Sequence, residues 1–175
     1  MKSIIIYGSL HGSTKRYAER LGEMTGMEAI DYKDAKDLAK YDRIICFGAL
    51  YASGVTGLKK IVANMKPNQE LFVATVGMAD PKDNAYIDTI RKALKEQIPP
   101  QLYDEKRIFH FRGAIDYSAL DFKHRMVMSM IHSKVSKMPE EELSAVFKVI
   151  LDTYGKKVDY VNFDTLKQLQ IKLLE

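Results

Sequence analysis

Two short runs of almost wholly apolar residues constrain the fold of this chain more than any other feature. Residues 44–47 and 71–76 are nearly free of polar side chains, which is typical of strands that are buried on both faces of a sheet. Segments in which apolar residues recur at helical spacing stand before, between and after these runs. Because parallel strands are joined by crossover helices, this alternation predicts an α/β fold with a doubly wound parallel sheet.

Five strands are expected in all, at residues 3–7, 27–32, 44–47, 71–76 and 107–111. Helices are expected between them, after Thr14, after Gly57 and after Asp83, whose carboxylate can cap a helix.

The C-terminal third contains more helix than five strands require. Asp121 can cap one helix, and Pro139 followed by three glutamates predicts the start of a second. A last helix, from about Asp164, is expected to cover the sheet. We therefore expect one domain over residues 1–175, in which residues 118–157 form a helical insertion after the fifth strand.

Charge is unevenly distributed along the chain. The 27 lysines and arginines exceed the 23 aspartates and glutamates by four, and residues 122–138 hold four basic residues and no acidic one. A basic helix rich in methionine suits a lid over a hydrophobic substrate, a protein partner, or peripheral contact with an anionic membrane. A solvated helix that packs its apolar side on the domain is the plainer alternative. No nucleic-acid partner is expected.

Cysteine usage and the N-terminal residues bear on the compartment. The single cysteine, Cys46, cannot form an intramolecular disulfide, and this favours a reducing environment. The apolar run at the N-terminus is too short for a signal-peptide core or a membrane span. We expect a cytoplasmic protein, with peripheral membrane contact left open. No His, Cys, Asp or Glu cluster has the spacing of a metal site, so no metal is expected.

The loop from Ser9 to Thr14 offers three hydroxyls, a glycine and the N-terminus of a helix. Backbone N–H groups and the helix dipole make such a place suitable for a phosphate. The loop also lies at the first strand–helix turn, beside the crevice where open α/β sheets bind ligands. The alternative is an ordinary turn in which Ser13 or Thr14 merely caps the helix. The Walker A and dinucleotide-binding patterns are both absent.

Two further loops follow the third and fourth strands at the same edge of the sheet. Residues 48–54 and 77–81 are rich in glycine and other small residues, so their backbones can approach a flat ring closely. Tyr51 is the only aromatic residue in either loop.

Taken together, the three loops resemble those of the flavodoxin family, whose motif between the first strand and helix is [ST]-x-[ST]-G-x-T. Ser9, Gly12 and Thr14 match this motif, and His11 stands in place of its second hydroxyl. The resemblance implies a flavodoxin-like fold with strand order 2-1-3-4-5 and FMN as the cofactor. It implies that the phosphate is held by Ser9, His11, Gly12, Ser13 and Thr14, with Leu10 of the same loop also binding the cofactor. It further implies that the ring is flanked by Ala49, Leu50, Tyr51 and Ala52 and by Gly77, Met78, Ala79 and Asp80.

Within that family the chain is most similar to the branch of menaquinone-dependent protoporphyrinogen oxidases. Residues 113–117 read Gly-Ala-Ile-Asp-Tyr after the fifth strand, and a basic, methionine-rich segment follows. This resemblance implies an FMN-dependent oxidoreductase that acts on a small hydrophobic or porphyrin-like substrate or a quinone.

Two other functions stay open at this point. One is an electron carrier that docks on redox partner proteins, and the other is an interaction module without flavin. No catalytic side chain is predicted, because the flavin itself would carry the chemistry.

Overall fold

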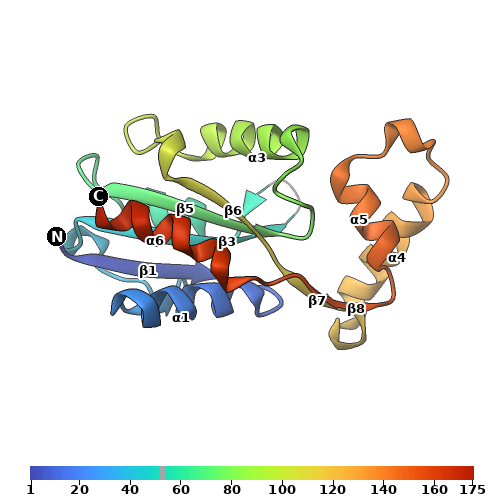
Figure 1. The fold of residues 1–175 in the computed structure, drawn as a ribbon, viewed down its shortest axis with the longest axis horizontal. Coiled ribbons are helices and arrows are strands. Elements are labelled where there is room, and N and C mark those ends of the chain that lie inside the picture. Colours follow the sequence, from blue (N-terminus) through green and yellow to red (C-terminus); the bar gives the residue numbers. More distant parts are fainter. Residues whose placement is uncertain (52–53) are drawn as a thin grey trace.

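The computed structural model describes residues 1–51 and 54–175 and contains a parallel sheet of five strands (Figure 1). The strand order is β2-β1-β3-β5-β6, which confirms the flavodoxin-like arrangement expected from the sequence. These parallel strands are β1 (Ser3–Gly8), β2 (Ala29–Asp31), β3 (Arg43–Tyr51), β5 (Glu70–Gly77) and β6 (Ile108–Arg112).

Four helices cover the two faces of the sheet, in places that the apolar spacing predicts. On one face, α2 (Leu58–Ala63) and α3 (Asn84–Gln97) pack on side chains such as Ile44. On the other face, α1 (Ser13–Thr25) and α6 (Leu166–Leu174) pack on side chains such as Ile45. Figure 1 shows α3 and α1 on opposite sides of the sheet. The last helix therefore covers the sheet, as expected.

The third strand is longer than its apolar run indicates. It continues through Gly48 to Tyr51 and pairs with a short antiparallel strand, β4 (Gly54–Val55). A Cβ atom on Gly48 would lie 2.0 Å from Cγ1 of Val55. The glycine after the apolar run therefore does not end the strand: it makes room for β4 to fold back across it.

A second, smaller sheet lies between β6 and α6. Strand β7 (Ala114–Asp116) pairs antiparallel with β8 (Lys157–Asp159), and α4 (Phe122–Val135) and α5 (Ala145–Thr153) lie between them in the chain. This helical region stands beyond the carboxyl ends of the parallel strands (Figure 1). Short 3₁₀ turns complete the structure at Leu38–Lys40, Glu105–Arg107, Tyr117–Ala119, Glu140–Glu142 and Phe163–Thr165.

One helix begins later than the sequence predicts. The expected helix from Pro139 is only a 3₁₀ turn at its start, and the α-helix begins at Ala145. Ser144 explains the shift, because its hydroxyl accepts a hydrogen bond from the backbone N–H of Phe147 and Pro139 has no such acceptor. The predicted cap at Asp121 is confirmed, since its carboxylate accepts a hydrogen bond from the N–H of His124.

Within residues 1–51 and 54–175, no helix has both the length and the apolar character needed to cross a bilayer.

Candidate functional site

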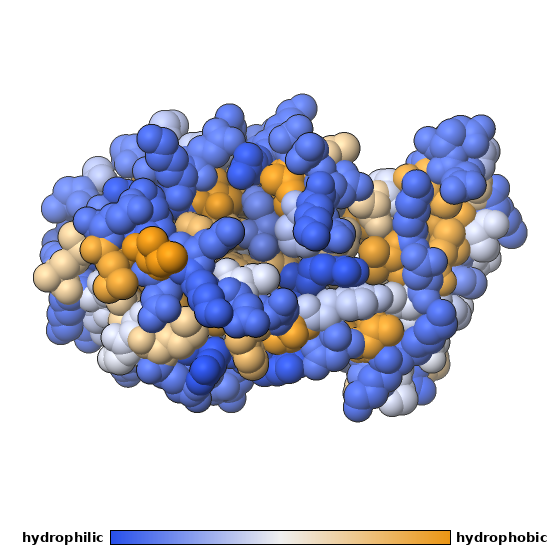
Figure 2. Space-filling view, viewed as in Figure 1, coloured by the Kyte–Doolittle hydropathy of each residue, from blue (hydrophilic) through white to orange (hydrophobic). Residues whose placement is uncertain are grey.

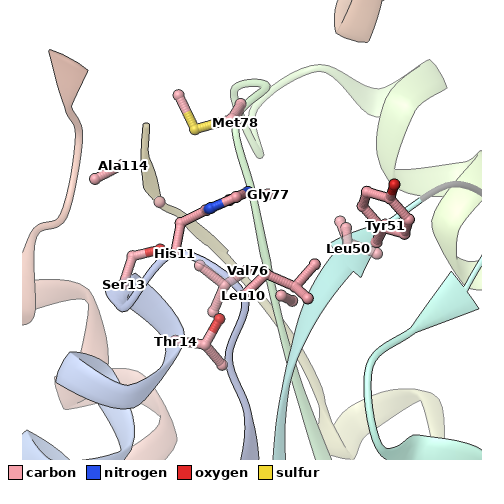
Figure 3. Close-up of a pocket in the computed structure, with 12 residues that line it drawn as sticks. Leu10, His11, Ser13, Thr14, Leu50, Tyr51, Val76, Gly77, Met78 and Ala114 are labelled. Carbon is pink, nitrogen blue, oxygen red and sulfur yellow. The ribbon is translucent and has the colours of Figure 1, made fainter. Parts of the chain in front are cut away.

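A cleft lies at the carboxyl ends of the parallel strands, where all three predicted loops meet (Figure 3). The cleft is shallow, with a cavity volume of about 80 Å³, and it opens to solvent. The cleft is lined by Leu10, His11, Ser13, Thr14, Ala49, Leu50, Tyr51, Val76, Gly77, Met78, Gly113 and Ala114.

Gly12 shapes the end of the cleft next to α1. It adopts a left-handed conformation with φ of +89° and is the residue immediately before the helix. Among the described residues, no side chain caps α1, so the alternative in which Ser13 or Thr14 serves only as a cap is wrong. Both of these residues lie in the first turn, are almost fully buried, and line the cleft.

The donors at this end of the cleft suit a phosphate group. The first N–H groups of a helix have no partner within the helix, and here no side chain of the described residues takes their place. Ser9 bridges the loop, since its Oγ accepts a hydrogen bond from the Gly12 N–H at 3.0 Å. The hydroxyls of Ser13 and Thr14 add further donors, and the first turn of α1 carries no acidic residue that would repel an anion.

The opposite walls of the cleft suit a flat, largely apolar group. Ala49, Leu50 and Tyr51 come from the end of β3, Val76 and Gly77 come from the end of β5, and Met78 follows that strand. The backbone at Gly77 is closely packed, because a Cβ atom there would lie 2.4 Å from Oη of Tyr86 and 2.8 Å from Cδ1 of Leu50.

Not every predicted residue is part of the cleft wall. Ser9 and Gly12 do not line the cleft but stabilise its loop through their hydrogen bond. Ala79 is buried and does not line the cleft. Asp80 is exposed, and its carboxylate accepts a hydrogen bond from the N–H of Lys82 within its own turn. Ala52 lies outside the described residues.

The chain segment after β6 contributes residues that the sequence did not assign to the site. Gly113 and Ala114 line the cleft, and a Cβ atom on Gly113 would lie 2.8 Å from Oγ of Ser13. Next to them, Nε and Nη2 of Arg112 each donate a hydrogen bond to the carbonyl oxygen of Met78 at 3.1 Å. The guanidinium group also lies 3.7 Å from the centre of the Tyr160 ring. Arg112 therefore holds the loop after β5 in place and puts a positive charge beside the cleft.

Helix α4 reaches the mouth of the cleft through His124. The imidazole centre of His124 lies 5.9 Å from that of His11 and 6.1 Å from the ring centre of Tyr51. Asp121 holds this ring, with Oδ2 of the carboxylate 2.9 Å from Nδ1. Burial, and then the nearby His124, lower the pKa of His11, so its neutral form is favoured. The only signal in the sequence was the Asp-x-x-His spacing at the start of a helix.

The described part of the chain contains no cluster of three or more His, Cys, Asp or Glu side chains that could hold a metal ion.

Residues 4–142 match the flavodoxin domain family. This is well over half of the chain, and the protein therefore belongs to that family. No curated protein matches the chain.

Several solved structures are similar to this chain. An archaeal flavodoxin has 18% identity, with 65% of this chain and 85% of that one covered and a TM-score of 0.44. A Fusobacterium nucleatum flavodoxin bound to flavin mononucleotide has 13% identity, 98% and 99% coverage and a TM-score of 0.43. The Flv1 flavodiiron core of Synechocystis has 15% identity and a TM-score of 0.42; this chain is covered over 63% of its length but spans only 30% of that one. The family assignment stands on the domain match.

Proposed function

We propose that this protein binds FMN, with the phosphate at the N-terminus of α1 and the ring between the ends of β3 and β5. The observation that carries this proposal is the pairing of an uncapped helix N-terminus with an apolar cleft. Ser13 and Thr14 supply backbone and hydroxyl donors for a dianion, and Gly12 sets the turn that presents them. Leu50, Tyr51 and the Gly77 backbone supply close, apolar surfaces for a planar ring.

We further propose an FMN-dependent oxidoreductase that transfers two electrons between a flat, largely apolar substrate and a quinone. The resemblance to the menaquinone-dependent protoporphyrinogen oxidases supports a porphyrinogen-like substrate. In the structure, the support comes from the helical region between β7 and β8. It brings His124 to the mouth of the cleft and so provides a second wall for a substrate that lies over the ring.

Bound FMN would supply the two-electron chemistry, and the chain would supply the surroundings. Arg112 fixes the carbonyl of Met78 so that the wall next to the ring is held rigid. The guanidinium charge beside the cleft favours a cofactor that becomes more negative on reduction. Leu50 and Val76 keep water away from one side of the cleft, while Tyr51 is half exposed and marks the side from which a substrate can enter.

Steady-state turnover tests this function most simply. Protein loaded with FMN is mixed anaerobically with protoporphyrinogen or another reduced porphyrin, and a water-soluble naphthoquinone is added as acceptor. We expect quinone-dependent formation of the oxidised porphyrin at a rate well above that of free FMN. Binding of FMN without any such turnover, together with a long-lived one-electron-reduced state, would instead identify an electron carrier.

One observation favours the carrier as the second candidate. Helix α4 exposes Phe122, Met126 and Met130, with 78%, 50% and 67% of each residue accessible to solvent. Figure 2 shows apolar surface on this helical region. Residues at positions i, i+4 and i+8 share one side of a helix, and such a stripe suits docking on a redox partner protein. Contact of residues 122–138 with an anionic membrane also stays a prediction.

A further inference from the structure

We propose that His124 is the proton-transfer residue of this site and that Asp121 is its positioning residue. This inference rests on the proposed FMN-dependent function and deepens it, because it names the protein group that exchanges a proton while two electrons pass through the flavin.

The hydrogen bonds of Asp121 fix the orientation of the imidazole. Its Oδ1 accepts a hydrogen bond from the backbone N–H of His124 at 2.8 Å, and its Oδ2 lies 2.9 Å from Nδ1 of the same residue. These two bonds hold the pKa of Asp121 below its usual value, so the group is a carboxylate near neutral pH. With Nδ1 engaged by a carboxylate, Nε2 is the nitrogen left to accept or donate a proton.

The neighbours of the imidazole place it at the cleft rather than on the outer surface. His11 and Tyr51, which lie edge-on to it, are both wall residues of the cleft and come from two different strand ends. The His124 side chain is 36% exposed, so a substrate can reach it without a conformational change.

Few charged or titratable groups surround His124. Asp121, His11 and Tyr51 face it, and Lys123 and Arg125 adjoin it on its own helix. Arg125 is engaged elsewhere, because its guanidinium group donates hydrogen bonds to the carbonyl oxygens of Leu120 and Ser118. Asp121 is therefore the one carboxylate hydrogen-bonded to the ring among the described residues.

Bound FMN would take a hydride, that is two electrons and one proton, from a substrate with adjacent C–H and N–H bonds and would later pass it to a quinone. Nε2 of His124 takes the remaining N–H proton of the substrate and then gives one proton to the quinone, which leaves as the quinol. The net change is oxidation of the substrate by two electrons and two protons and reduction of the quinone by the same amount. Proton transfer by a positioned side chain contributes on the order of 10²–10⁴-fold to such a reaction.

The decisive experiment measures the midpoint potential of bound FMN against pH in the full-length protein. If His124 takes up a proton when the flavin is reduced, the potential falls more steeply with pH than it would for the flavin alone. His124→Phe keeps a ring against His11 and Tyr51 but cannot take up the proton, so this extra slope should vanish. His132→Phe is the matched control, because His132 lies on the same helix but stacks on Tyr154 at 3.9 Å. It should retain the wild-type profile.

Two further measurements complete the test. Asp121→Asn preserves the helix cap, since asparagine caps as well as aspartate, but it removes the charge that favours a protonated imidazole, so the extra slope should be smaller than in the wild type. In the turnover assay, His124→Phe should lower kcat/KM by about 100-fold with unchanged FMN affinity.

The outcomes separate the two proposals. Identical pH dependence of the potential in wild type and His124→Phe would overturn the role of His124 even if turnover is observed. A difference confined to His124→Phe, with no turnover by the wild type, would leave the proton-transfer role standing and reject the oxidoreductase function.

Discussion

The hydroxyl group of Tyr17 lies where three segments that are distant in the sequence come together. Its oxygen donates a hydrogen bond to the carbonyl of Arg112 and accepts one from the N–H of Asn162, both at 2.9 Å. Arg112 ends β6, where the chain enters the helical region, and Asn162 follows β8, where the chain leaves it. The Tyr17 hydroxyl therefore connects α1 to both of these segments. Arg16 adds an ion pair with Asp159 at 2.8 Å.

Replacing Tyr17 by phenylalanine should therefore destabilise the protein although it removes only one oxygen atom. The change leaves a part-buried carbonyl and a part-buried N–H without their partner, at a cost of about 1 kcal/mol in the free energy of unfolding. Urea unfolding measures this difference. Tyr7→Phe is the control, because the Tyr7 hydroxyl makes no hydrogen bond among the described residues. Equal stability of the two variants would contradict this role for Tyr17.

The burial of His110 should make the stability of the folded protein depend on pH. Its Nδ1 lies 2.7 Å from Oγ1 of Thr75, and burial, with a smaller effect of Arg91, lowers its pKa from 6.5 to about 4. Between these two values the unfolded chain binds a proton that the folded chain does not. The contribution of this group to the free energy of unfolding is therefore fully present above pH 6.5. It falls by about 3 kcal/mol as the pH approaches 4.

The variant His110→Gln should lose this part of the acid sensitivity while keeping a side chain that can bond to Thr75. Urea unfolding of wild type and variant at a series of pH values between 7.5 and 4 tests the prediction. The two curves should converge as the pH falls. Parallel curves would show that His110 is not the group responsible.

At the scale of elements, the sequence predicts the strands and helices whose apolar pattern is set by burial alone. Leu166, Leu169 and Leu173 illustrate this, because their spacing indicates a helix face and all three are buried on the sheet. Apolar spacing does not predict features that depend on a single local interaction. The helix α5 begins where the Ser144 hydroxyl caps it, and β4 pairs with β3 because Gly48 has no side chain to block Val55.

The β3–β4 pairing gives a test at this scale. Gly48→Ala places a methyl group 2.0 Å from Cγ1 of Val55, and we expect a loss of about 1–3 kcal/mol in stability from overpacking. The hairpin must shift to relieve the contact, and FMN affinity should fall with it because β3 carries Leu50 and Tyr51 into the cleft. Gly54→Ala is the matched control, since its nearest neighbour would be an ordinary 3.6 Å contact with Oε1 of Gln97. Thermal unfolding and FMN titration of both variants test this prediction. Equal stability and equal FMN affinity in the two variants would contradict it.

At the scale of the whole molecule, the sequence predicts the family, the strand order and the three loops that meet at the cleft. A motif that lies within one short stretch, such as Ser9 to Thr14, carries its own geometry, because a helix N-terminus always presents its N–H groups. The approach of His124 to His11 and Tyr51 was not predictable in this way. It depends on how the β7–β8 pair directs α4 toward the carboxyl ends of the parallel strands, and no local sequence pattern encodes that direction.

FMN titration of the purified protein, followed by flavin fluorescence, tests whether the cleft binds this cofactor. We expect saturable binding of one FMN per chain. We also expect affinity at least tenfold weaker in Gly12→Val, because a β-branched residue does not tolerate the φ of +89° that presents the N–H groups of α1. Gly26→Val, at the other end of the same helix with φ of +72°, carries a similar strain and should bind FMN like the wild type. Absence of FMN binding, or equal affinity in the Gly12 and Gly26 variants, would contradict the account.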